Sequence, residues 1–188
     1  MPTSARKQLV FCCSFCYDMH GDYMDLPQRK NIRLTDFDYN TPGAYFITIC
    51  TQDRKNVLGH IVGGGAFDAP HIQLSPLGKI TEKYLISGNR IPNVHVDKYV
   101  IMPNHLHFIL LVDGVDENGA SKAPPPTNAV IPHFVSTMKR FCFAEAGCKY
   151  LQRSYHDHVI RNQMDYLRIW EYIDTNPVKW KDDCFYEE

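Results

Sequence analysis

The stretch YVIMPNHLHFILLV, residues 99–112, places two histidines inside a run that otherwise has the composition of a buried β-strand. Side chains alternate between the two faces of a strand, so His105 and His107 point the same way and lie about 7 Å apart along the chain. Leu106 and Phe108 point to the opposite face, which we expect to be core. Two neutral imidazoles on one face predict a metal site. The alternative is a pair of core histidines with hydrogen-bond partners.

Secondary structure is predicted on both sides of this stretch. Residue patterns predict strands at 43–52, 94–102, 105–112 and 153–160, and a glycine-bearing hairpin at 59–74. Helices are predicted from Ser75 to Gly88, over 131–147 and over 162–176, where Asn162 can cap the first turn. The apolar face of the second helix is predicted to consist of Phe134, Met138, Phe141 and Ala144. The proline-bearing segment 113–128 is expected to be a flexible loop. This order predicts an α+β fold: a ferredoxin-like or RRM-like sandwich with a mainly antiparallel sheet and an added C-terminal helix.

The balance of charges over the whole chain gives no support to a nucleic-acid partner. The chain has 188 residues, with 20 basic and 21 acidic side chains and a net charge of −1. A nucleic-acid partner would therefore have to meet a local basic surface. Seven cysteines without a convincing secretory signal predict reduced thiols and a cytoplasmic protein, and no segment predicts a membrane partner.

The first 27 residues are expected to be a poorly ordered leader, and residues 28–188 a single domain. Cys13 and Cys16 form a C-x-x-C motif, but a structural zinc site normally needs a second closely spaced ligand pair. Met19 and Met24 are alternative starts, and the stretch from Met24 already has the character of a domain entry. The sequence leaves open which methionine begins the protein.

The last predicted helix carries a tyrosine beside its apolar stripe. On a helical wheel the stripe consists of Tyr166, Ile169, Trp170 and Ile173. Tyr172 and Asn176 fall one turn apart on the edge of this stripe, so a phenol and an amide share one side of the helix. The alternative is an ordinary exposed tyrosine on an amphipathic helix.

The two segments MPNHLHFILLV and YHDHVIRNQMDYLRIWEYIDTNPVKW resemble the HUH single-tyrosine transposases, specifically the REP-associated tyrosine transposase branch. The resemblance runs from about Lys30 to Trp180. It implies that His105, Leu106 and His107 form the metal-binding motif, that Tyr172 is the nucleophile and that Asn176 is a further metal ligand. It also implies the ferredoxin-like fold and Mg²⁺ or Mn²⁺ as the metal; histidine ligands by themselves favour Mn²⁺.

The function implied by the resemblance is that of a metal-dependent single-stranded DNA transposase or endonuclease. Such an enzyme cleaves and rejoins hairpin-forming, REP-like DNA through a 5′-phosphotyrosine intermediate, and acts as a monomer or a homodimer. Two alternatives stay open. One is a domesticated protein that binds a DNA hairpin without cutting it. The other is an H-x-H metal hydrolase, although no H-x-H-x-D follows His107.

A mild excess of positive charge lies between residues 139 and 168, with six basic against three acidic residues. Such an excess suits contacts with a phosphate backbone, although charges of this kind usually solvate a helix face. The candidate DNA contacts are Lys139, Arg140, Arg153, His158 and Arg161. His156 and His158 form a second H-x-H motif, and metal binding by this pair is the alternative. Tyr150, Tyr155 and Tyr166 are rival nucleophiles; Tyr166 is expected to face the core, and the other two lack a polar residue at the right spacing.

Overall fold

A computed structural model describes residues 41–64, 68–113 and 130–186. All of them belong to one compact unit, Ile32–Glu188. Several predictions fall on residues outside this described part of the chain. They are the leader, the Cys13–Cys16 motif, the alternative starts and nearly all of the loop expected at 113–128. Within those residues, no helix is both long and apolar enough to cross a membrane.

Four strands form the main sheet, as the sequence predicts. They are β1 (Gly43–Cys50), β4 (Val94–Ile101), β5 (His105–Val112) and β6 (His156–Ile160). Their order is β4-β5-β1-β6, and every neighbouring pair is antiparallel. The two central strands are therefore distant in sequence, which is the arrangement of a ferredoxin-like sandwich. The predicted α+β fold is confirmed.

The helices begin and end close to their sequence signals. Helix α1 spans Pro76–Ser87, and the Ser75 side chain accepts a hydrogen bond from the Gly78 amide at 3.1 Å. Helix α2 spans Val130–Ala146 and α3 spans Gln163–Thr175. The Asp165 amide donates to Asn162 Oδ1 at 2.9 Å, so the predicted cap of α3 is confirmed.

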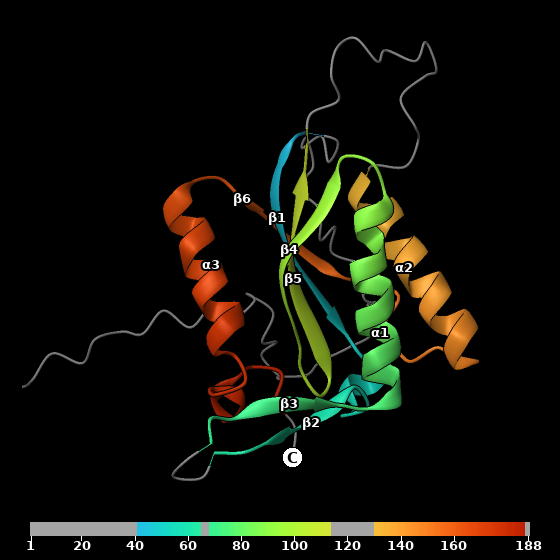
Figure 1. The fold of residues 1–188 in the computed structure, drawn as a ribbon, viewed down its shortest axis with the longest axis vertical. Helices are drawn as coiled ribbons and strands as arrows, with labels where there is room; N and C mark the ends of the chain where they lie inside the picture. The colour runs from blue at the N-terminus through green and yellow to red at the C-terminus, as the bar shows by residue number, and fades with distance from the viewer. Residues whose placement is uncertain (1–40, 65–67, 114–129, 187–188) are drawn as a thin grey trace, which may run out of the picture. The chain divides into compact units, whose positions relative to one another are not determined.

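Helices α1 and α2 lie on one side of the sheet and α3 on the other (Figure 1). Alternation along β5 separates two apolar clusters. Leu106, Phe108 and Leu110 join the larger cluster, which also holds residues of α1 and α2, while Ile109 packs with Ile169 and Ile173 of α3. His105 and His107 have the same strand parity as Ile109, so both histidines belong to the face that α3 covers.

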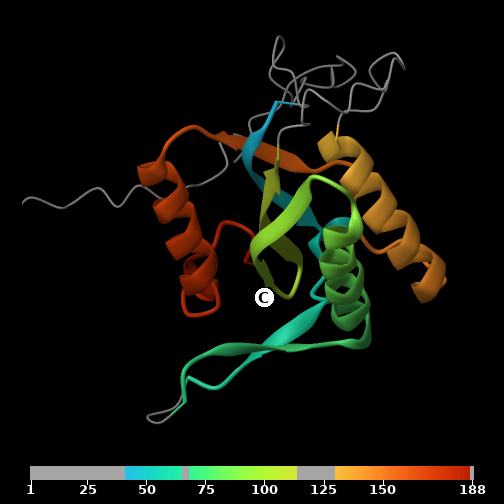
Figure 2. The ribbon, with the colours of Figure 1, turned by 45° about the horizontal axis from the view of Figure 1, so that its top comes forward.

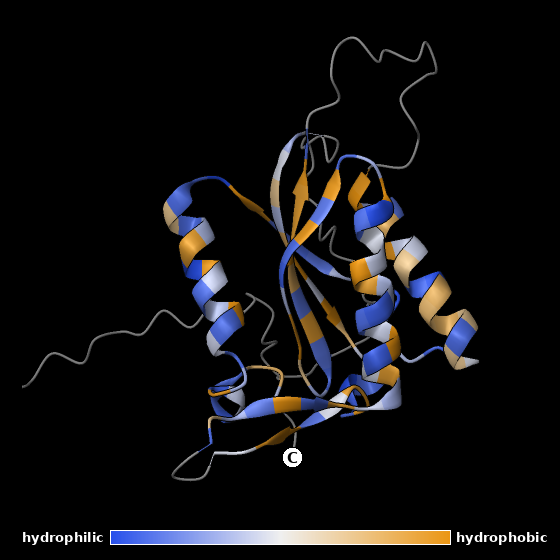
Figure 3. Ribbon diagram, in the orientation of Figure 1, coloured by the Kyte–Doolittle hydropathy of each residue, from blue (hydrophilic) through white to orange (hydrophobic). Residues whose placement is uncertain are grey.

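The apolar faces of two helices differ from the prediction. In α2, Phe141 is 44% exposed, and the buried positions include Val135, Lys139 and Cys142. The buried face is thus rotated toward Lys139. In α3, Trp170 is 39% exposed, and its ring lies 3.8 Å from Lys98 Nζ. Figure 3 shows mainly hydrophilic residues along α3 with hydrophobic ones interspersed, which agrees with the narrow contact of this helix.

The predicted hairpin forms a separate small sheet. Strand β2 (Gly59–Val62) pairs with β3 (His71–Leu74) in antiparallel register. Figure 2 shows this ribbon extending away from the main sheet, starting near the N-terminal end of α1. It contributes none of the predicted site residues.

Candidate metal and nucleophile site

The antiparallel register of β1 and β5 fixes the two histidines of the H-x-H motif. Thr48 lies directly opposite His107, and its Oγ1 is 2.8 Å from His107 Nδ1. His105 Nδ1 is 2.8 Å from the side-chain oxygen of Asn104, whose amide nitrogen donates to the Phe185 carbonyl at 2.6 Å. In the tautomers that donate from Nδ1 to these two oxygens, the Nε2 atoms carry the lone pairs that could bind a cation.

Both imidazoles are neutral at neutral pH. His105 is 0% exposed and His107 is 1% exposed. Burial lowers the pKa of His105 to about 3, assisted by the positive charge of Arg54. Burial also lowers the pKa of His107 well below its usual value, and His105 adds to this effect. Neutral imidazole is the form that binds metal.

Tyr172 brings its phenol to the open nitrogen of His107. Helix α3 places Tyr172 Oη 3.3 Å from His107 Nε2, and the two rings meet edge to face with centroids 5.3 Å apart. Phe46 of β1 contacts both rings, stacking on His107 and meeting Tyr172 by its edge. Burial raises the pKa of Tyr172 well above its usual value, and the carboxylate of Asp183 raises it further. The phenol is therefore fully protonated in the resting protein.

Asp183 is a site residue that the sequence reasoning missed. Its Oδ2 accepts hydrogen bonds from Asn176 Nδ2 at 2.9 Å and from Tyr172 Oη at 3.4 Å. His105, His107 and Asp183 each offer one ligand atom, and these atoms lie within 4.8 Å of one another. Asp183 follows Asn176 by seven positions in a polar stretch, and no pattern in the sequence singles it out.

The donor atoms at this site fit a divalent cation. Asn176 is 2% exposed and lies at the end of α3. Two buried side-chain polar atoms in the described residues have no hydrogen-bond partner, His105 Nε2 and Asn176 Oδ1. A buried acceptor without a partner costs roughly 1–3 kcal/mol, and a cation would remove that cost at both atoms. Imidazole nitrogen, amide oxygen and carboxylate oxygen together suit Mn²⁺ and Mg²⁺.

The rival tyrosines are engaged elsewhere. Tyr150 Oη is 2.9 Å from Thr81 Oγ1 of α1, on the other side of the sheet. Tyr155 lines a cavity beside α2. Tyr166 donates from its hydroxyl to Asp97 of β4 at 2.5 Å. Tyr172 is thus the tyrosine that the fold brings to the histidine pair.

The five predicted DNA-contacting residues do not form one group. Lys139 is 6% exposed, and its ammonium donates to the carbonyls of Gln152, Arg153 and Ser154 at 2.8, 3.3 and 3.0 Å. Burial lowers the pKa of Lys139 to about 8. Its donors are thus committed to the chain that leads into β6. In this structure Lys139 links α2 to the segment before β6. It is not at the surface, where a contact with the DNA backbone would require it to be.

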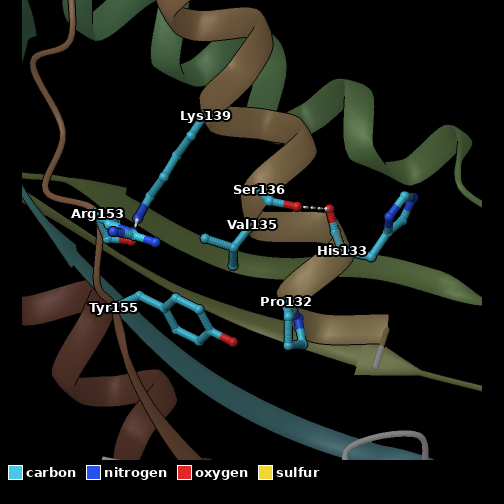
Figure 4. A pocket seen from close by; sticks show the side chains of 7 residues that line it. All are labelled: Pro132, His133, Val135, Ser136, Lys139, Arg153 and Tyr155. Atoms are coloured by element: carbon cyan, nitrogen blue, oxygen red, sulfur yellow. Dashed lines mark hydrogen bonds between the residues drawn. The ribbon is translucent and has the colours of Figure 1, made fainter. Parts of the chain in front are cut away.

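Lys139 and Arg153 also line a cavity of about 370 Å³ between α2 and the segment before β6 (Figure 4). The wall is completed by Tyr155, Pro132, His133, Val135 and Ser136. The other three predicted residues lie apart from this cavity: Arg140 is exposed on α2, and Arg161 is exposed between β6 and α3. His158 pairs with Asp165 at 2.9 Å.

The second H-x-H motif lies on the edge strand beside the site. His156 is opposite Thr48 and His158 is opposite Phe46 in the pairing of β6 with β1. Residues directly opposite one another share a face of the sheet, so this pair borders the face that carries His107. Among the described residues, however, the cluster of metal-binding groups joins the β5 histidines to Asp183.

Comparisons with known proteins found one curated relative and a shared fold. An uncharacterised protein of Haemophilus influenzae is 32% identical over 175 residues, which cover 84% of this chain and 93% of the relative. A solved structure of a REP-associated tyrosine transposase bound to a REP hairpin matches with a TM-score of 0.52 and 20% identity, over 74% of this chain and 68% of that chain. No sequence-family model matches.

Proposed function

This chain belongs to the same family as the Haemophilus influenzae protein and has the fold of a REP-associated tyrosine transposase, and from these premises we propose that it is a metal-dependent single-stranded DNA transposase or endonuclease. It cleaves and rejoins hairpin-forming DNA through a covalent 5′-phosphotyrosine intermediate. Tyr172 is the nucleophile, and His105, His107 and Asn176 bind Mg²⁺ or Mn²⁺.

The observation that carries this proposal is the contact between Tyr172 Oη and His107 Nε2 at 3.3 Å. It joins a half-buried phenol on α3 to a pair of buried histidines on β5, although Tyr172 and His107 are 65 positions apart in sequence. Around the same point, His105 Nε2 and Asn176 Oδ1 are buried acceptors without partners. A nucleophile beside ligand atoms without partners is an arrangement suited to metal-assisted phosphoryl transfer.

The chain's own residues determine which bond is made and which is broken. The oxygen of Tyr172 forms a bond to phosphorus, and the bond between phosphorus and the 3′ oxygen breaks. The phenol loses its proton and the departing 3′ oxygen gains one, so a 5′-phosphotyrosine and a free 3′-hydroxyl result. Helix α3 holds the phenol against Phe46 and His107, which orients its oxygen for this attack. When bound, a divalent cation would offset the negative charge that develops at phosphate.

The 3′-hydroxyl explains why strand transfer needs no external energy source. Attack of that hydroxyl on the phosphotyrosine restores a phosphodiester and frees Tyr172 Oη, and a different 3′ end can react in the same way. Backbone contacts are assigned to Arg140, Arg153, His158 and Arg161, whose exposed side chains carry N–H donors for phosphate oxygens.

The proposal is tested by trapping the covalent link. The protein is incubated with end-labelled hairpin single strands and Mn²⁺ or Mg²⁺, and the products are separated on a denaturing gel. We expect a slowly migrating protein–DNA adduct that is abolished by Tyr172→Phe and weakened or lost with His105→Ala. Tyr166→Phe is the matched control, because Tyr166 lies on the same helix with its hydroxyl on Asp97.

Other outcomes identify the competing functions. An adduct that survives Tyr172→Phe would refute the assigned nucleophile. Cleavage without an adduct would point to a metal hydrolase. In that case Asp183 would supply the carboxylate ligand that the sequence lacks in the form of an H-x-H-x-D motif. Tight binding of the hairpin without cleavage would identify a domesticated binding protein.

A further inference from the structure

The chain after α3 turns back over the histidine pair. A short 3-10 helix, η4 (Trp180–Asp182), leads into Phe185, and the rings of Trp180 and Phe185 lie 5.9 and 4.6 Å from the ring of His105. Asn104 Nδ2 donates to the Phe185 carbonyl at 2.6 Å, so the same asparagine joins this segment to His105. Residues 180–185 thus form one wall of the site.

Asp183 is the acidic residue that this turn directs into the site. Its Oδ1 accepts a hydrogen bond from the Phe185 amide at 2.8 Å, and its Oδ2 accepts from Asn176 Nδ2 at 2.9 Å. None of the ion pairs found among the described residues includes Asp183. Its charge therefore meets neutral donors within the described part of the chain, which leaves it available to a cation.

The geometry points to Asp183 as a ligand of the divalent cation, in addition to the two histidines and Asn176; this inference rests on the proposed metal-dependent function. Ligands of one octahedral ion with bonds near 2.1 Å lie about 3 to 4.2 Å apart. The ligand atoms of His105, His107 and Asp183 are within 4.8 Å of one another, so a small inward shift would bring them to the separations that one ion requires. His105 Nε2 and Asn176 Oδ1 are buried acceptors without hydrogen-bond partners at the same site.

A carboxylate changes the site in two ways. It adds the hard oxygen ligand that Mg²⁺ and Mn²⁺ prefer, and it reduces the net charge of the metal site from +2 to +1. It also holds Asn176, because the bond from Asn176 Nδ2 to Asp183 leaves Oδ1 as the free end of the amide. Asp183 therefore binds the cation and orients a second ligand.

The first test measures metal binding by the full chain without DNA. Free Mn²⁺ is followed by electron paramagnetic resonance during titration of the wild type, Asp183→Asn and Asp182→Asn. Asp182 is the matched control, because it is the preceding residue and is exposed. We expect one bound Mn²⁺ in the wild type, at least tenfold weaker binding by Asp183→Asn and unchanged binding by Asp182→Asn. His105→Ala should also weaken binding.

Unfolding temperatures in excess EDTA show whether a variant has lost its fold. If Asp183→Asn melts close to the wild type there, weaker Mn²⁺ binding reports on the ligand itself. A second variant covers the case in which it melts lower. In a Cys184→Ser background, Asp183→Cys should bind Cd²⁺ more tightly than the background and Mn²⁺ more weakly, because thiolate favours the softer ion. Asp182→Cys should show neither change.

Equal Mn²⁺ affinity of Asp183→Asn and the wild type would overturn the inference, and so would a wild type that binds no Mn²⁺. The inference would also be overturned if Asp183→Asn bound Mn²⁺ as tightly as the wild type and formed more covalent adduct. Asp183 would then obstruct the site. The proposed function fails separately. If Asp183→Asn loses Mn²⁺ affinity while the wild type forms no adduct, Asp183 is a ligand in a protein that does not perform the proposed cleavage.

Discussion

Thr48 on β1 and His107 on β5 are direct neighbours in the antiparallel register, and the Thr48 hydroxyl lies 2.8 Å from His107 Nδ1. Thr48 is 5% exposed, so little water competes for this contact. In the tautomer of His107 that donates from Nδ1 to this hydroxyl, the lone pair lies on Nε2, where Tyr172 Oη is also found. The β1 side chain at position 48 therefore occupies one nitrogen of His107 and leaves the other facing Tyr172.

Removing this hydroxyl should weaken metal binding. Thr48→Val keeps the branched shape of the side chain, but it leaves Nδ1 without its partner and frees the other tautomer. Partners of this kind are worth about 10- to 100-fold in metal affinity, and we expect a loss in that range for Mn²⁺. Calorimetric titration provides the measurement. Thr48→Ser retains the hydroxyl and should bind Mn²⁺ within a few-fold of the wild type; equal affinity of Thr48→Val would contradict this role.

The metal-free protein should lose stability as the pH falls below neutrality. Burial lowers the pKa of His105 to about 3 in the folded chain, whereas a histidine in the unfolded chain titrates near about 6.5. Between these values the unfolded state binds a proton that the folded state does not. The contribution of His105 is therefore fully present above pH about 6.5 and is lost as the pH falls toward 3.

Urea unfolding in EDTA at two pH values, about 7 and about 5, measures this effect. The free energy of unfolding should fall between them, and His105→Leu should fall by less, because it has no proton to take up. His60→Leu is the matched control, since His60 is exposed on β2, and it should fall as much as the wild type. An undiminished fall in His105→Leu would argue against a buried neutral His105.

Lys139 should matter to folding more than to DNA binding. Its ammonium is the donor for three carbonyls before β6, and Lys139→Met would leave buried acceptors without a partner. We expect a loss of about 2 kcal/mol in the free energy of unfolding. Affinity of the folded variant for a DNA hairpin should be unchanged. Lys149→Met, at an exposed position just beyond α2, should leave stability within about 0.5 kcal/mol of the wild type.

The main sheet and the histidine pair could be predicted because strand alternation is a local rule. His105 and His107 share a face whatever the strand pairs with, and the helix caps at Ser75 and Asn162 depend on neighbouring residues alone. The role of Asp183 could not be predicted in this way. It depends on the reversal of the chain after α3 and on the packing of Phe185 against His105, both of which are tertiary.

Lys139 is an intermediate case. Its helical spacing indicates a buried position, whereas its charge indicates a surface position. The buried positions of α2 follow helical spacing, and Lys139 falls four residues after Val135 and three before Cys142. The charge of Lys139 favoured a surface position in the prediction. Including the aromatic Phe141 in the predicted apolar face of α2 placed that face away from Lys139. The partners that make its burial tolerable, the carbonyls before β6, come from another segment.

Arg161 is assigned a contact with the DNA backbone in the proposed function. Arg161 is exposed directly before the cap of α3, and a backbone phosphate contact there should be independent of sequence. Arg161→Gln should weaken binding to hairpins of different sequence by the same factor and should reduce the salt dependence of binding by about one counterion. Arg90→Gln is the matched control, since Arg90 is exposed in η2 (Gly88–Arg90), which follows the helix on the opposite side of the sheet. Fluorescence anisotropy at several salt concentrations gives both quantities. If Arg161→Gln and Arg90→Gln shift the salt slope equally, the effect is one of net charge, and the interface must lie elsewhere on the molecule.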